Sequence, residues 1–141
     1  MALNLIKLAV GIEEIEQLPV RQARWRNSRG NTRHQTRMFP TREADIVPGG
    51  SLYWVIRGMI QVRQPIVALH RKKDESGKSY CVIELAMQHV IVEATARRPF
   101  QGWRYLKAED APRDLSAKGT AYVDPKMPTE LRLELRRLGL L

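Results

Sequence analysis

The chain has 141 residues, of which 43% are apolar and 28% charged, so it is long and apolar enough for a single globular domain over residues 1–141. A single cysteine excludes an intramolecular disulfide, and three histidines without the spacing of metal ligands argue against a metal or cofactor. The lack of a long apolar run or signal-peptide pattern predicts a cytoplasmic protein without membrane insertion. The net charge of +9 indicates an anionic partner, and nucleic acid is preferred over a membrane because no basic amphipathic helix is visible.

The chain begins with a predicted strand and a predicted helix. Residues 3–10 are mostly apolar and end at Gly11, as in a short buried strand. Apolar residues recur every third position over 12–18, which fits one face of a helix. Pro19 either ends that helix or begins another one that runs into the arginines that follow.

The next segment is one-sidedly basic. Between Glu16 and Glu43 there is no lysine or carboxylate, but there are seven arginines: Arg21, Arg24, Arg26, Arg29, Arg33, Arg37 and Arg42. Surfaces that only provide solubility usually mix both signs, and guanidinium groups bind phosphate bidentately, so this segment predicts a phosphate-bearing partner. Turn-forming residues among the arginines predict a mobile Arg-rich loop at 27–36. The alternative is a loop that is merely basic.

A strand-rich middle section follows. We expect a short strand over 36–39, a short helix over 42–47 and a tight turn at 48–50. Apolar residues alternate over 51–62, which predicts one strand with a bulge or bend at the glycine, and a neighbouring strand returns at 66–69 after an interruption by proline. The partly polar face of the long strand carries two further candidate anion-binding residues, which an ordinary solvated sheet face would also explain: Arg57 and Arg63.

The last third predicts two more strands and a C-terminal helix. A hairpin loop at 74–78 connects to a strand over 80–85, and a further strand spans 89–95. One or two helical turns are expected over 110–115. Leucines spaced at i, i+4 and i+7 over 131–138 predict a final helix that docks by its leucine face.

Aromatic rings alternate with guanidinium groups in a second candidate site. Aromatic faces can stack on unpaired bases while arginines hold the phosphates. The alternative is that the rings plug one end of the sheet and the arginines are solvated. The candidate residues, which surround Phe100 and Gly102, are Arg97, Arg98, Gln101, Trp103, Arg104 and Tyr105.

Catalytic residues are not identified by any pattern. Asp110 and Asp114 have helical spacing, but such carboxylates usually favour a helix start. His70 and Glu84 could face each other across a hairpin as a base and its orienting group, or as an ordinary cross-strand pair. Cys81 lies in an apolar alternation and is expected to be an inert core thiol. The chain has no Gly-rich phosphate loop, dinucleotide fingerprint or nucleophile elbow.

Several stretches along the chain are distinctive: LIKL at 5–8, TRMFP at 36–40, GGSLYWVIRG at 49–58, RQ at 63–64, PFQGWRYL at 99–106, DAP at 110–112 and LGL at 138–140. Together they resemble an alphaproteobacterial family known as domain of unknown function 1489, and the resemblance runs through nearly the whole chain. The resemblance implies a small soluble bacterial protein and no particular activity. A weaker likeness in fold connects the bent strand after residues 49–50 to the PUA/ASCH group of small barrels that hold RNA. The chain lacks the ASCH-type glycine-lysine-glutamate motif, so no enzymatic activity is carried over.

We therefore expect an α+β domain with a small, curved, mostly antiparallel sheet that closes toward a PUA-like barrel, flanked by an N-terminal and a C-terminal helix. The expected function is RNA binding, in which the arginines neutralise phosphates while Trp103, Tyr105 and also Tyr53 stack on bases. One alternative is an enzyme or binder that acts on a nucleotide or other anionic small molecule. The other is a protein-protein adaptor with an exposed aromatic patch.

Overall fold

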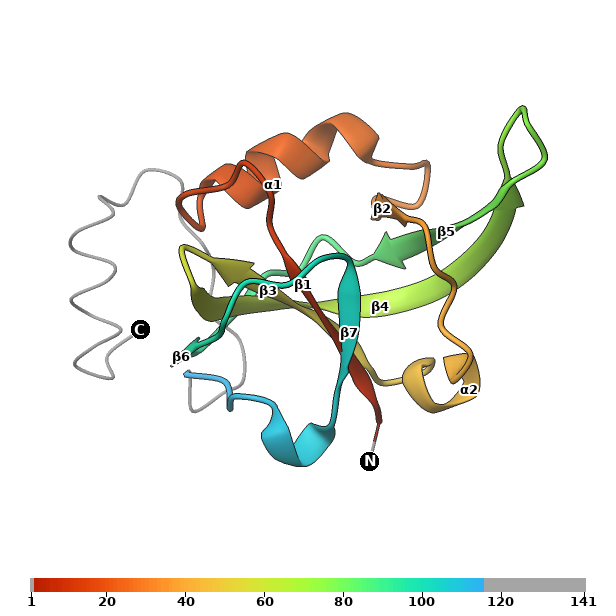
Figure 1. The fold of residues 1–141 in the computed structure, drawn as a ribbon. Helices are drawn as coiled ribbons and strands as arrows, with labels where there is room; N and C mark the ends of the chain where they lie inside the picture. Colours follow the sequence, from red (N-terminus) through yellow and green to blue (C-terminus); the bar gives the residue numbers. More distant parts are fainter. Residues whose placement is uncertain (1, 116–141) are drawn as a thin grey trace.

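The computed structural model describes residues 2–115, which form one curled sheet and two short helices (Figure 1). Short 3₁₀ turns at Ala23–Trp25 and Ala108–Asp110 follow the first helix and the last strand. No helix among the described residues is long and apolar enough to cross a bilayer. The elements in chain order are β1 (Asn4–Leu8), α1 (Gln17–Gln22), β2 (Thr32–Thr36), α2 (Glu43–Ile46), β3 (Ser51–Ile56), β4 (Met59–Lys73), β5 (Ser79–Leu85), β6 (Val90–Ala96) and β7 (Trp103–Leu106).

The sheet is mixed and open. Its strands lie in the order β2-β5-β4-β3-β1-β7, and β6 pairs with the first half of β4. β1 runs parallel to β3, whereas the other ladders are antiparallel. No ladder joins β2 to β7 within residues 2–115. The curved, mostly antiparallel sheet is confirmed, but the expected closure into a barrel is not found.

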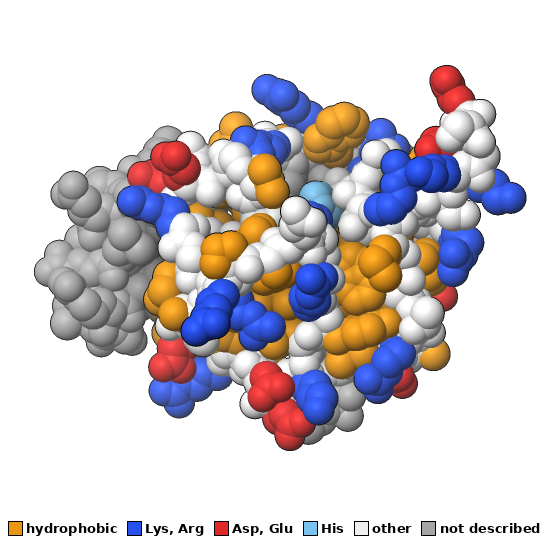
Figure 2. Space-filling model, viewed as in Figure 1, with side chains coloured by type: hydrophobic (Ala, Val, Ile, Leu, Met, Phe, Trp, Pro, Cys, Tyr) orange, Lys and Arg blue, Asp and Glu red, His pale blue; other side chains and the backbone are white. Residues whose placement is uncertain are grey.

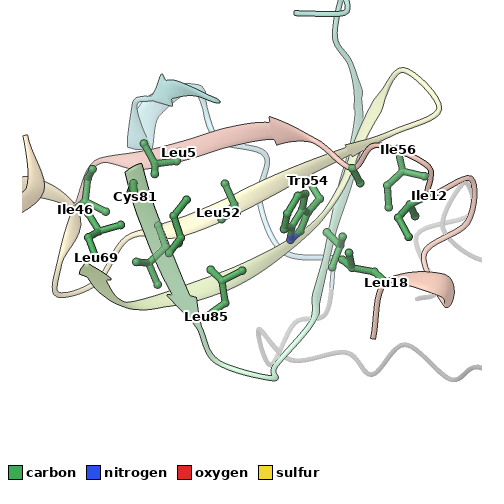
Figure 3. Packing of buried hydrophobic residues seen from close by; sticks show 14 of the residues in the cluster. Leu5, Ile12, Leu18, Ile46, Leu52, Trp54, Ile56, Leu69, Cys81 and Leu85 are labelled. Atoms are coloured by element: carbon green, nitrogen blue, oxygen red, sulfur yellow. The ribbon is translucent and has the colours of Figure 1, made fainter. Parts of the chain in front are cut away.

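Apolar residues pack on both faces of β3. The larger cluster brings Leu52 and Trp54 of β3 against Leu85 of β5, with Leu18 of α1 and Ile46 of α2 closing its ends (Figure 3). The smaller cluster lies on the opposite face and combines Tyr53 and Val55 with the partly buried Leu8, Phe100 and Ala111. All six residues of β3 are consequently buried, which is typical of a central strand.

The single strand predicted over residues 51–62 is wrong: the chain reverses there in a tight hairpin. Arg57 and Gly58 form its two-residue loop, with φ angles of 54° and 76°, as a type I′ turn requires. A two-residue loop should shift the alternation by one position, but a bulge in β4 opposite the Trp54–Val55 step restores it. Val62 therefore returns to the face of Trp54, which made two strands look like one.

Other element predictions are confirmed or corrected. The strands at the N-terminus and over 80–85 and the short helix after residue 42 are confirmed. The helix predicted over 12–18 begins only at Gln17, with Pro19 in its first turn, where a missing N–H costs nothing. β4 continues through Pro65 rather than stopping there. The helical turns predicted over 110–115 are not found, because the 3₁₀ turn ends at Asp110 and residues 111–115 are not helical. The helix predicted over 131–138 lies outside the described residues.

The predicted loop at 27–36 is too long, because β2 occupies its second half. β2 pairs with β5 and faces the core through Thr32, whose hydroxyl donates a 2.9 Å hydrogen bond to the Gln22 carbonyl. The strand contains no apolar residue, so hydrophobic periodicity could not reveal it. The predicted strand over 36–39 starts where β2 ends. The mobility of this segment stays a prediction.

Candidate functional site

The strands at the two ends of the sheet, β2 and β7, are not paired with each other within residues 2–115. At one end of the seam between them, side chains of β7 bind the segment that follows β2. Trp103 of β7 donates a 2.8 Å hydrogen bond from Nε1 to the Met38 carbonyl. The Tyr105 hydroxyl lies 3.3 Å from Thr41 Oγ1 and accepts a hydrogen bond of the same length from the Arg42 backbone N–H. The two rings contact each other edge to face, with centroids 4.9 Å apart. This end of the seam is therefore filled.

At the other end of the seam lies a cavity of about 390 Å³. A hollow under α1, with histidine and basic side chains in it, is visible on this face of the molecule (Figure 2). The cavity walls come from β1 and the turn after it, from α1 and the 3₁₀ turn, and from β2. The lining residues are Lys7, Leu8, Ala9, Val10, Ile12, Leu18, Arg21, Gln22, Trp25, Arg33, His34, Gln35 and Trp54.

Among the residues that the structure describes, three cations and no carboxylate line the cavity. Lys7 is half-buried, and burial lowers the pKa of its ammonium group. Its side chain forms no hydrogen bond or ion pair with any described residue. Arg21 is tied to the wall, because its guanidinium donates to the carbonyls of Val10 at 2.6 Å and Gly11 at 3.1 Å. Arg33 forms no ion pair with a described residue. The electrostatics of the cavity thus favour an anion.

His34 lies beside Lys7 and is uncharged at neutral pH. Burial, and then the nearby Lys7 charge, lower the pKa of His34 to about 4. Its ring meets the Trp54 ring edge to face, with centroids 5.1 Å apart. Its Nε2 atom is buried and has no hydrogen-bond partner in the described part of the chain. A buried polar atom without a partner is uncommon and therefore calls for an explanation.

Trp25 provides an exposed aromatic surface at the cavity. Half of its side chain is exposed, and the Arg33 guanidinium lies over its ring at 5.4 Å from the centroid. Sequence patterns did not single out Trp25, Lys7 or Trp54 as site residues. For Trp25 a signal existed, since an aromatic residue among arginines is typical of single-stranded nucleic-acid binding. No such signal existed for Lys7, because it is a single charged residue within a mostly apolar strand.

A buried amide network holds the inner wall of the cavity in place. Gln64 Oε1 accepts hydrogen bonds from Gln22 Nε2 at 2.6 Å and from Trp54 Nε1 at 2.8 Å. Gln64 Nε2 donates to the Ala86 carbonyl, and the Gln22 Oε1 atom lies 2.7 Å from His89 Nε2. Burial lowers the pKa of His89 to about 4, so this network is neutral. Gln22 and Trp54 are therefore fixed before any ligand arrives.

The predicted arginines of the basic segment are not equivalent. Arg29 binds the buried Glu84 at 3.2 Å, so it serves the fold, as Arg21 does. Arg37 and Arg42 make exposed ion pairs of 3.5 and 3.0 Å with aspartates, which contribute little stability. The remaining three form no ion pair with any described residue and stand on or next to the cavity elements: Arg24, Arg26 and Arg33.

Glu84 anchors the turn that precedes β2. It accepts hydrogen bonds from Asn27 and Asn31 at 3.1 and 2.8 Å, and it lies 3.0 Å from His70 Nε2. Burial alone would raise the pKa of Glu84, but the hydrogen bonds from His70, Asn31 and Asn27 and the charge of Arg29 lower it to about 2. His70 and Glu84 therefore do face each other, but as part of a clamp that holds the turn.

The other predicted anion-binding residues are scattered. Arg63 binds Asp114 through two 2.8 Å hydrogen bonds and Ser51 Oγ at 2.9 Å, so it is engaged within the fold. Arg104 donates to the carbonyl of Gln101, whose own side chain is exposed. Three further arginines are exposed and make no ion pair with a described residue: Arg57, Arg97 and Arg98.

The aromatic candidates lie in the core or the seam. Trp103 and Tyr105 are half-buried against the larger cluster, and Tyr53 is 6% exposed. Whether Trp103 or Tyr105 stacks on a base stays a prediction.

No catalytic group is apparent in the described residues. Asp110 ends a 3₁₀ turn while Asp114 bridges to β6, so the two carboxylates do not share a helix face. Burial raises the pKa of the Cys81 thiol to about 11, which makes it unreactive at neutral pH. No group of three or more histidine, cysteine or acidic residues within residues 2–115 could hold a metal ion.

The chain belongs to the family described as protein of unknown function (DUF1489), whose model matches residues 5–141. No curated protein and no solved structure matches the chain significantly. The family thus supplies no activity, and the function has to be argued from the site.

Proposed function

We propose that this member of the family binds RNA, with the phosphate backbone on the basic surface around the cavity and a base against Trp25. The observation that carries the proposal is the cavity itself, whose described lining residues include three cations and an exposed tryptophan ring but no carboxylate. Phosphates need the cations and an unpaired base needs the ring, so a single-stranded nucleic acid uses both.

The arginines without ion pairs support the same ligand. Arg24, Arg26 and Arg33 lie in the 3₁₀ turn, just after it and in β2, next to or within the cavity wall. An arginine without an acidic neighbour keeps its full charge for a ligand. In this proposal these three residues replace the full set of seven, because Arg21 and Arg29 are engaged within the fold and Arg37 and Arg42 pair with aspartates.

The electrostatic part is tested by the salt dependence of RNA binding, measured by fluorescence anisotropy with a labelled single-stranded RNA. About three phosphate contacts give a slope near −2 and a loss of roughly 20-fold in affinity between 50 and 200 mM salt. Replacing Arg24, Arg26 or Arg33 singly with glutamine should reduce the slope by about 0.7. Arg113→Gln, which removes an exposed arginine paired with Glu93, is the control and should leave it unchanged. Salt-independent binding, or none at 50 mM salt, would refute the proposal.

The stacking part is tested with a matched pair of tryptophan variants. Trp25→Ala should weaken RNA binding by about 1–3 kcal/mol at nearly constant melting temperature, because the ring is half exposed. Trp103→Ala should instead lower folding stability by about 3 kcal/mol, because the ring fills the seam. The reverse pattern would assign stacking to Trp103 and not to Trp25.

A binder of a small anionic molecule is the second candidate. The cavity volume of about 390 Å³ lies in the range of small-molecule sites. The adaptor alternative finds less support, since Trp25 is the one aromatic residue among the exposed large hydrophobic residues of the described chain.

A further inference from the structure

We infer that the cavity between β1, α1 and β2 binds one nucleotide unit, with its phosphate at Lys7 and Arg33 and its base between Trp25 and the inner wall. The inference rests on the proposed function, which it deepens by naming the group that enters the cavity. The surface arginines can bind a strand from outside, whereas this inference concerns what occupies the space within.

The first argument is an unbalanced charge. Charged groups that leave water are normally paired, because desolvation costs several kcal/mol per ion. Lys7 is half-buried and lacks an ion pair among the described residues, and burial lowers its pKa. No acidic residue within residues 2–115 lines the space around it. A phosphate group at this position would supply the missing counter-charge and would also reach Arg33 on the neighbouring wall.

The second argument is an unsatisfied hydrogen-bonding atom. His34 is neutral, so one of its ring nitrogens donates a hydrogen bond and the other accepts one. Its Nε2 atom has no partner although the ring lines the cavity. A small rotation of the His34 ring against the fixed Trp54 ring would present this nitrogen to a ligand. The edges of a base offer both donors and acceptors.

The third argument is the aromatic and apolar wall. Trp25 is exposed at the cavity, and Trp54 is held rigidly by Gln64 behind it. An inorganic anion would use Lys7 and Arg33 but would leave the rings and His34 without a role. An uncharged aromatic ligand would use the rings but would leave Lys7 unpaired. A nucleotide uses both sets of groups.

The inference is tested with free mononucleotides, which are too short to use the outer surface. Binding of AMP, GMP, CMP and UMP is followed by tryptophan fluorescence in a Trp103→Phe background, so that Trp25 and Trp54 report. Inorganic phosphate, adenosine and benzoate are the comparison ligands. At least one mononucleotide should bind roughly tenfold or more tightly than each of these, because a charge-assisted hydrogen bond and base stacking each contribute about that factor.

Variants locate the binding site. Lys7→Met and Arg33→Gln should each weaken mononucleotide binding by roughly 10-fold or more. His34→Gln should weaken binding or change the base preference. Lys72→Met removes an exposed lysine outside the cavity and should bind as the parent does. Melting temperatures are recorded for all variants. Backbone amide shifts of the unmodified protein locate the ligand independently of any folding defect, and they should move at Val10 and Gln35.

The outcomes separate this inference from the proposed function. No mononucleotide binding at millimolar concentration, phosphate that binds as tightly as the nucleotides, or amide shifts confined to residues outside the cavity would each overturn the inference, even if RNA binds with the expected salt slope. Mononucleotide binding in the cavity without RNA binding would uphold the inference and overturn the proposed function. Binding of both, with the Lys7 and Arg33 variants affected, would uphold the two together.

Discussion

Replacing Glu84 with glutamine should loosen the turn between α1 and β2 and destabilise the whole domain. The carboxylate is 3% exposed and receives hydrogen bonds from Asn27, Arg29, Asn31 and His70. Its pKa falls from the ordinary 4.5 to about 2 despite burial. That difference of about 2.5 pKa units, at 1.36 kcal/mol each, corresponds to about 3 kcal/mol of stability from the ionised form.

The sign of the pH dependence follows from the same values. Because the folded pKa of Glu84 is depressed, its stabilisation is fully present above pH 4.5 and is lost as the pH falls toward 2. The unmodified protein should therefore lose stability across this window, and Glu84→Gln should show a shallower loss there. At neutral pH the variant should be less stable by about 3 kcal/mol.

Urea denaturation at pH 7 and pH 3 measures both effects. Glu93→Gln is the matched control, because Glu93 is 54% exposed and pairs with Arg113, which is 85% exposed. That exposed pair should contribute less than about 1 kcal/mol. Hydrogen exchange of the amides of residues 27–31 should also accelerate in the Glu84 variant. Equal stability of the two variants at pH 7 would refute the idea that Glu84 is a structural anchor.

Three further results are expected from single features. Lowering the pH from 6.5 to 4 should destabilise the protein, because burial holds the pKa of His34 and His89 at about 4 in the folded chain, so the unfolded chain takes up protons first. Chemical denaturation across this pH range measures the loss of stability. A double variant, His34→Gln with His89→Gln, that loses stability as steeply with pH as the unmodified protein would contradict this. Gly50→Ala should lower the free energy of unfolding by about 1–3 kcal/mol, since a Cβ atom would collide with two backbone carbonyl oxygens. Thermal melting measures the effect, and an unchanged midpoint would show that the backbone moves aside freely. Arg57→Asn should raise stability by about 0.5 kcal/mol or more, because an Asn-Gly pair suits the type I′ turn, and a lower urea midpoint would argue against the assigned turn.

Hydrophobic alternation along the sequence predicted many of the strands, but it did not predict how they are connected. β1 and β5 have apolar residues at regular spacing and were located correctly. β2 was missed because its inward positions are Thr32, His34 and Thr36, which carry no apolar signal. The hairpin at Arg57 was hidden by a compensating bulge, which no local pattern reveals.

The sequence predicted the positive charge of the candidate site but not its location in the fold. The excess of arginine identified the correct part of the chain, yet composition could not show that Arg29 is neutralised by Glu84, which lies 55 positions away. Lys7 and His34 come together only because the sheet curls until β2 approaches β1. Such contacts depend on tertiary structure, so spacing along the chain carries no information about them.

The position of β1 within the sheet bears on how the chain can assemble. Leu5 pairs with Leu52 on one side and with Tyr105 on the other, so the first strand of the chain is an inner strand. Both pairings close long loops, which costs chain entropy before any contact offsets it and is typical of slow folding. During synthesis β1 therefore cannot be paired on both sides until β7 has left the ribosome. A fragment that ends before residue 103 would leave one edge of this apolar strand open to other chains.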